Sequence, residues 1–265
     1  MEEVSEGRYL YCIINSGAET SLGAIGIEDS RVYTVACKDI SSVVHSCAAK
    51  PYDSKDEQKV KEWVLSHQYT IDASTEKFGT VIPLAFDTIV KGDDETVKEW
   101  LSENYAELKE KLEKVRDKAE FTVQIFWDQE LIIPKVEETN EELKKLKEDM
   151  KKKSKGAAYM LRRKSEKLLK NALLAEAERY SRDFYEQIKE HVDDLRIEAT
   201  KSARVPKKWQ DKQMILNLSC LVHNDKVERL GKELEKINEM EGFSVRFTGP
   251  WAPFSFVGEI GERRR

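Results

Sequence analysis

Tyr9-Leu10-Tyr11-Cys12-Ile13-Ile14 is an apolar run, rich in aromatic and β-branched residues, that stops at Asn15-Ser16-Gly17. An apolar run that ends at turn-forming residues is typical of a strand buried on both faces. A strand without a polar face belongs in the interior of a sheet. We therefore expect residues 9–14 to be a central strand of the first domain.

Further strands and a helix follow this run. Arg31–Cys37 and Ile40–His45 are strand candidates separated by only two residues, which predicts a tight hairpin. Ser54 and Glu57 have capping-box spacing, so a helix is expected to begin there and to end at Gly79. Its apolar stripe consists of Val60, Val64, His67, Ile71 and Phe78.

The rest of the first domain alternates strands with helices. Thr80–Val90 is a strand candidate interrupted by Pro83, and Asp93 or Asp94 can cap a second helix. That helix is expected to run unbroken for about five or six turns. In Glu120–Asp128 apolar and polar residues alternate, as in a half-buried strand that closes the domain. The order predicts helices on a mostly antiparallel sheet in a ferredoxin-like arrangement. The stripe of the second helix is Val97, Leu101, Tyr105, Leu108, Leu112 and Val115.

A charge switch marks the start of the second domain. Residues 137–149 hold six acids and three lysines, whereas Lys151–Lys170 holds nine bases and one acid. An apolar stripe from Gly156 predicts one long helix that reaches Ala199. Residues 214–222, 227–237 and 243–248 then predict a βαβ unit. We expect an α+β chain of two domains, residues 1–130 and 131–265, with ferredoxin-like sheets and one long helix.

Composition limits the classes of function. The chain has 265 residues, 40% hydrophobic and 36% charged, and a formal net charge of −5, which does not favour nucleic acid or an anionic membrane. The acidic N-terminus lacks an apolar stretch, and no run of about 18 apolar residues exists, so we expect neither a secretory signal nor a membrane span. The four cysteines show no CxxC spacing and are expected to be reduced packing residues of a cytosolic protein.

No motif of catalysis, metal binding or cofactor binding is present. His67 lies on an apolar stripe without a second ligand or nucleophile nearby, so a packed histidine is the better interpretation than a general base. The sequence lacks HExxH, GxSxG, P-loop and GxGxxG patterns. The basic residues of 151–170, Arg162 and Arg163 above all, could meet an acidic partner or RNA, although such a run is usually a solvated face.

The segment Gly249-Pro250-Trp251-Ala252-Pro253-Phe254-Ser255-Phe256 is unusual for a loop, because two prolines stiffen a backbone that presents aromatic side chains. It resembles the Gly-Pro-Trp-Pro-Pro-Tyr-Ser-Phe signature of gas vesicle proteins of the F/L family. Residues 9–11, 80–86 and 156–164 match three other blocks of this family in the same order. Departures include Ala252 and Phe254, where the family usually has Pro and Tyr, and Ala85 and Asp87, where Arg and Gly are common.

The resemblance implies an accessory role in building gas vesicles, the protein shells that give cells buoyancy. Members of this family resemble two-domain α+β proteins and are not known as enzymes. The implied partners are the major gas vesicle shell protein, which is small and hydrophobic, and other accessory proteins. The resemblance implies no nucleic acid, membrane or cofactor as a partner. It implies a location in the cytoplasm or on the gas vesicle. Such binding needs apolar contacts inside a charged rim. The candidate contact residues are Trp251, Pro250, Pro253, Phe254, Arg162, Arg163 and Tyr159.

Alternatives remain open at this stage. The Trp251 loop could anchor a partner, or it could fold back as a plug over a sheet or a domain junction. A ferredoxin-like ligand-binding protein or enzyme would need a deep pocket with convergent polar groups. An RNA-binding sheet would need exposed Tyr9 and Tyr11, which the apolar run argues against.

Overall fold

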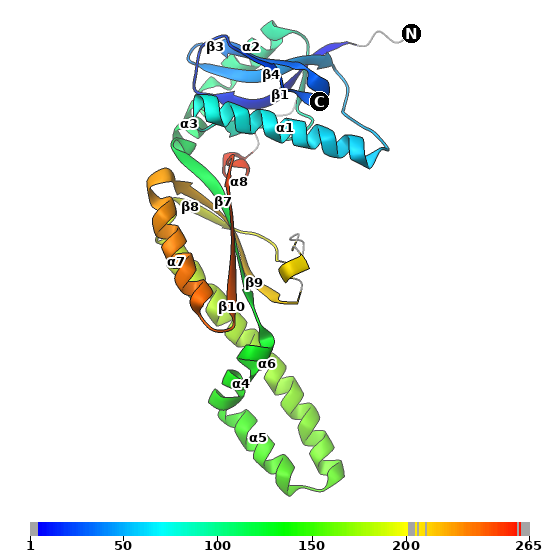
Figure 1. Cartoon of the computed structure of the whole chain (residues 1–265), viewed down its shortest axis with the longest axis vertical. Helices are drawn as coiled ribbons and strands as arrows, with labels where there is room; N and C mark the ends of the chain where they lie inside the picture. The colour runs from blue at the N-terminus through cyan, green and yellow to red at the C-terminus, as the bar shows by residue number, and fades with distance from the viewer. Residues whose placement is uncertain (1–4, 201–204, 206, 210, 259, 261–265) are drawn as a thin grey trace. The chain divides into compact units, whose positions relative to one another are not determined.

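The computed structural model describes residues 5–200, 205, 207–209, 211–258 and 260, which form an α+β fold (Figure 1). The expected fold class is confirmed. The chain divides into two compact units. The first contains the described residues of 1–120, 221–224 and 249–265, and the second those of 121–220 and 225–248. The expected domain limits at 130 and 131 stay a prediction.

The first sheet is built around β1 (Glu6–Ile14). Its order is β2-β3-β4-β1-β5, and β6 also pairs with β1. Eight of the nine residues of β1 are buried, so the expectation of a central strand is confirmed. The predicted hairpin is present as β3 and β4, which are antiparallel. The other strands are β2 (Ser21–Ala24), β3 (Arg31–Cys37), β4 (Ile40–Ala48), β5 (Ile82–Pro83) and β6 (Ile89–Lys91).

Helices cover both faces of this sheet, which explains why β1 has no polar face. Tyr9 and Tyr11 pack in a cluster with Trp63 and Ile71 of α1 (Glu57–Phe78). Leu10 packs in a second cluster with residues of α2 (Asp94–Glu103) and α3 (Tyr105–Val115). Both tyrosine rings are fully buried, so neither is a base-stacking platform for RNA.

The start and the buried face of α1 differ from the expectation. Asp56 caps the helix by accepting hydrogen bonds from the amides of Gln58 and Lys59, whereas Ser54 accepts one from Asp56. The capping-box assignment was therefore wrong, because an aspartate next to the helix competed with the serine. Trp63, not Val64, faces the sheet. Gly79 ends the helix at a φ of 81°, as expected.

Two other elements of the first domain are shorter than expected. Residues 80–90 form the two short strands β5 and β6, because Pro83 cannot donate to the sheet and Asp87 has a positive φ of 67°. The single helix expected over Val97–Val115 is two helices. They meet at Asn104, whose side-chain amide donates to the carbonyl oxygen of Trp100. Asparagine competes in this way with the helical hydrogen bonds.

The second sheet has the order β10-β7-β9-β8. Its strands and long helices follow in the chain as β-α-β-β-α-β, the ferredoxin-like order. The strand expected to close the first domain, Glu120–Asp128, instead opens this arrangement as β7. Alternation alone cannot identify the sheet, because the partners of β7 lie about a hundred residues away in the sequence. The strands are β7 (Lys118–Trp127), β8 (Asp194–Ile197), β9 (Gln213–His223) and β10 (Phe243–Trp251).

Four helices belong to this arrangement, and two were not expected. They are α4 (Gln129–Thr139), α5 (Glu141–Lys152), α6 (Lys155–Lys189) and α7 (Val227–Glu239). Asn140, whose side chain accepts a hydrogen bond from the amide of Leu143, is the capping signal at the start of α5. The long helix ends at Lys189 and not at Ala199, because Leu195 lies in β8. The expected βαβ unit is present as β9, α7 and β10.

Candidate functional site

The C-terminal segment 249–257 sorts its side chains into an exposed and a buried set. The Gly249–Pro250 bond is cis, and after Trp251 the chain turns into α8 (Phe254–Val257). Trp251 is 46% exposed and Phe254 is 39% exposed. The buried set is Ala252, Pro253, Phe256 and Val257.

A buried carboxylate fastens this segment to the first unit. The amide of Ser255 donates to Oε2 of Glu120 over 2.8 Å, and the Ser255 hydroxyl donates to Oε1 over 2.6 Å. Phe256 and Val257 extend the core cluster of β1, α2 and α3. The two exposed rings therefore stand on a docked segment, and little conformational entropy remains to be lost when they meet a partner.

Different residues of this segment have the features of a plug and of a partner anchor, the two roles considered from the sequence. Phe256 and Ala252 close over the first unit, as a plug does. Trp251 and Phe254 stay at the surface with large apolar areas, the feature of an anchor. Pro253 is buried and Pro250 is exposed.

The other candidate contact residues lie near the start of α6, in the second unit. Tyr159 is 59% exposed, and the Arg163 guanidinium is 5.9 Å from the centre of its ring. Arg162 pairs with Glu166 over 3.1 Å. Both members of that pair are exposed, so it contributes little to stability.

Two histidines and three tyrosines form a buried cluster beneath α1. His67 Nε2 donates to the carbonyl oxygen of Leu84, so its Nδ1 accepts the Tyr9 hydroxyl over 2.9 Å. The Tyr11 hydroxyl accepts from the amide of Ile27 and is hydrogen-bonded to His45 Nδ1 over 2.7 Å. The other ring nitrogen of His45, Nε2, is hydrogen-bonded to the hydroxyl of the third tyrosine, Tyr52, over 3.0 Å.

Burial keeps this cluster neutral. It lowers the pKa of His45 and of His67 to about 4 and raises the pKa of Tyr52 to about 12. Because Tyr9 also accepts the amide of Asp87, the cluster fixes the segment between β5 and β6. The expectation that His67 is packed is confirmed. In the described residues no group of three or more His, Cys, Asp or Glu side chains could hold a metal ion.

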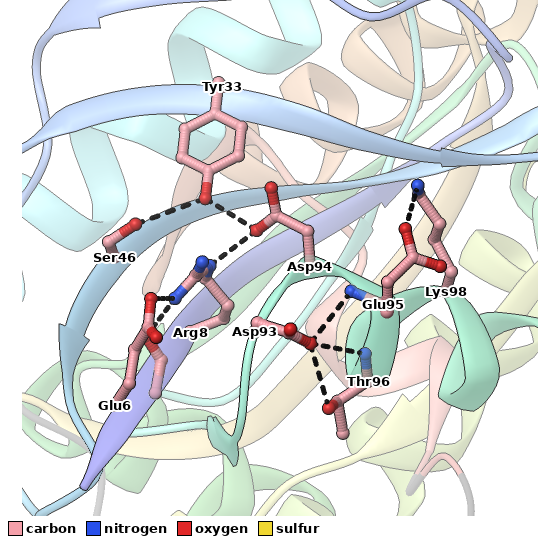
Figure 2. A network of polar contacts seen from close by, with 10 residues as sticks. Glu6, Arg8, Tyr33, Ser46, Asp93, Asp94, Glu95, Thr96 and Lys98 are labelled. Atoms are coloured by element: carbon pink, nitrogen blue, oxygen red, sulfur yellow. Dashed lines mark hydrogen bonds and ion pairs between the residues drawn. The ribbon is translucent and has the colours of Figure 1, made fainter.

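A polar network joins the start of β1 to the start of α2 (Figure 2). Arg8 is buried and donates through Nε to Asp94 and through Nη1 to Glu6. Tyr33 donates to the same Asp94 oxygen over 2.8 Å. Burial alone lowers the pKa of Arg8, but the bonds to Asp94 and Glu6 outweigh it and raise that pKa, so Arg8 stays charged.

An open polar cavity of about 320 Å³ adjoins this network, lined by β2, β3 and the first turns of α2. Two of its charged groups, Asp94 and Lys98, have partners nearby. Asp94 pairs with Arg8 and Tyr33, and Lys98 pairs with Glu95 over 2.6 Å. The geometry is that of a structural tie between strand and helix.

We predict that Asp94→Ala lowers the free energy of unfolding by about 1–3 kcal/mol, because it removes one of the two carboxylates that pair with the buried Arg8 and leaves it with Glu6 and the Gly7 carbonyl oxygen. Urea unfolding followed by circular dichroism measures this change. Glu95→Ala is the matched control, since it removes an exposed carboxylate of the same helix turn. Equal stability of Asp94→Ala and the control would show that Asp94 does not stabilise Arg8.

With this geometry in hand, comparison with known proteins identifies the family. A model of the family described as "Gas vesicle synthesis protein GvpL/GvpF" matches residues 7–258. The chain belongs to the GvpL/GvpF family. This assignment gives it a role in gas vesicles, and the family is not known as one of enzymes.

Two gas vesicle proteins of the L type align along almost the whole chain. Gas vesicle protein L1 of Halobacterium salinarum is 29% identical over 98% of this chain and 93% of its own length. Gas vesicle protein L of Haloferax mediterranei is 28% identical over 97% of this chain and 89% of its own.

A solved structure supports the fold of this GvpL/GvpF family member. The crystal structure of GvpF from an Anabaena species is 21% identical, covers 97% of this chain and 100% of its own, and superposes with a TM-score of 0.75. At this identity the similarity shows the fold alone. Among the residues that the model describes, no helix is long and apolar enough to cross a membrane.

Sequence reasoning missed the residues that position the site. Arg8 and Glu120 lie inside strand patterns, where a charge signals a buried partner only after the fold is known. The partners of Glu120 are 135 positions away. His45 and Tyr52 were also missed, although a histidine at the end of an apolar strand is a usable signal of a buried hydrogen-bond network.

Proposed function

We propose that this GvpL/GvpF family member binds the small hydrophobic shell protein, and other accessory proteins, while gas vesicles are assembled. The exposed pair Trp251 and Phe254 makes the apolar contact with the shell protein. The chain acts by binding and not by catalysis, in the cytoplasm and on the vesicle, where it remains as a minor component or leaves once the shell is complete.

The observation that carries this proposal is the exposure of two aromatic rings on a docked segment. Exposed aromatic residues on rigid supports are the usual energetic centres of protein interfaces. Because Phe256 and Val257 are buried beneath them, the rings keep their places without a partner. A shell subunit with exposed apolar surface would find these rings already ordered.

Trp251→Ala is expected to weaken binding of the shell protein by about 30-fold or more, the usual effect of truncating a central interface tryptophan. The measurement is co-purification of the tagged chain with the shell protein, followed by titration of the purified pair. Circular dichroism must first show that the variant is folded. Phe254→Ala is expected to have a smaller effect in the same direction.

Leu174→Ala is the matched control, because Leu174 is a half-exposed apolar residue of α6, far from the tail in sequence. It should leave binding unchanged. If the wild-type chain captured no shell protein, the proposal would fail in its direct form. If folded Trp251→Ala bound as well as wild type, the shell contact would lie elsewhere on the chain.

A further inference from the structure

The outward face of α1 carries an exposed apolar patch bordered by acids. Leu65 is 58% exposed and Tyr69 is 60% exposed, one helical turn apart on the side opposite the buried Trp63 and His67. Glu62, Asp72 and Glu76 lie on the same side of the helix. In the described part of the chain no salt bridge uses these three carboxylates, although Gln58 donates to Glu62 and Gln68 donates to Asp72. The α1 face is defined here as Glu62, Leu65, Tyr69, Asp72 and Glu76.

The hairpin of α5 and α6 has the opposite character at its tip. Met160 is 70% exposed and Tyr159 lies beside it. Lys151, Lys152 and Lys153 are exposed at the turn between the helices, and none of them takes part in an ion pair with a described residue. Residues 141–170 hold twelve bases and five acids in a chain whose net charge is −5. The hairpin tip is defined here as Lys151–Lys153, Tyr159, Met160 and Arg163.

We propose that the hairpin tip of one copy of this chain docks on the α1 face of a second copy. The two surfaces are complementary, since each has a small apolar centre and a border in which one sign of charge predominates, with Lys61 the exception on the acidic side. Among the described residues, the named charges of the two borders have no ionic partner. The basic border of the hairpin tip attracts the acidic border of the α1 face. Contacts between two tips or between two α1 faces are disfavoured, because they bring like charges together. The surfaces differ, so the contact is heterologous and adds copies head to tail.

The size and charge of the patches set the strength expected. A few apolar side chains on each side place the contact in the weak, transient class of interfaces. Its charged borders are largely exposed, so salt screens them. The Debye length, over which exposed charges interact, falls from about 30 Å at 0.01 M salt to about 3 Å at 1 M. Association should therefore rise with protein concentration, grow beyond dimers at low salt and disappear at high salt.

Sedimentation velocity of the full chain at low salt tests the proposal with two charge-reversed variants. The tip variant is Lys152→Glu with Lys153→Glu, and the face variant is Asp72→Lys with Glu76→Lys. Each alone should weaken self-association about tenfold or more, because like charges then meet. An equimolar mixture should associate again, since the basic tip of the face variant fits the acidic face of the tip variant.

The matched control is Lys167→Glu with Lys170→Glu, two exposed lysines farther along α6 that give the same net charge as the tip variant. It should associate like wild type. The proposal is overturned if wild type stays monomeric at every concentration in low salt. It is equally overturned if the control variant loses self-association to the same extent as the tip variant. A mixture of the two charge-reversed variants that stays monomeric would also overturn it.

Discussion

Acidification from pH 6.5 to about 4 is expected to destabilise the chain by roughly 3 kcal/mol for each of the buried residues His45 and His67. Both imidazoles are held neutral between tyrosine hydroxyls and a backbone carbonyl. A proton on His67 Nδ1 would remove the acceptor of the Tyr9 hydroxyl. Protonation of either imidazole would place a charge in an apolar core.

The sign follows from the direction of the pKa shift. In the unfolded chain each histidine takes up a proton near pH 6.5, whereas in the folded chain its pKa is about 4. Between these values the unfolded state binds more protons, so the free energy of unfolding falls as the pH falls. Well above pH 6.5 both states are neutral at these positions, and the two residues add no further pH dependence.

Urea unfolding at a series of pH values measures this slope. The double variant His45→Gln with His67→Gln keeps donors and acceptors but cannot titrate, so its slope between pH 6.5 and 4 should be much shallower than that of wild type. Tyr52→Phe is the control, because it removes a partner of His45 and keeps both imidazoles buried. If all three proteins had the same slope, exposed carboxylates would account for the acid sensitivity.

Local patterns predicted the elements whose burial is decided by neighbours in sequence. The run at 9–14 had to be central because it lacks a polar face, and β1 is central. The hairpin of β3 and β4 followed from a two-residue connection. Gly79, at positive φ, ends α1 as expected.

Elements decided by distant partners could not be assigned in this way. The alternation in 120–128 predicts a strand correctly but not its sheet, because β7 is joined by Gln124 to Asn217 and Arg246. The stripe from Val97 to Val115 continues through Asn104, so periodicity alone hides the break between α2 and α3. In the same way Trp251 was a visible candidate, whereas its support, Glu120, was not.

Glu120→Ala is expected to lower the free energy of unfolding by about 3 kcal/mol and to release the aromatic tail. The substitution removes the two charge-assisted hydrogen bonds that Glu120 accepts from the amide and the hydroxyl of Ser255. Glu120→Gln should cost less, since its amide oxygen can still accept one of the two bonds. Ser255→Ala should also cost less, because the backbone bond remains.

Urea unfolding and limited proteolysis of the C-terminal segment measure the two consequences separately. Released tails should be cleaved faster in Glu120→Ala than in Ser255→Ala, and the shell protein should be captured less well although both rings are intact. If a variant lost both shell-protein capture and protection of its tail from proteolysis, docking of Phe256 and Val257 would be what orders Trp251 for binding. Unchanged stability and unchanged cleavage would contradict the role of Glu120, and the apolar contacts alone would then have to hold the tail.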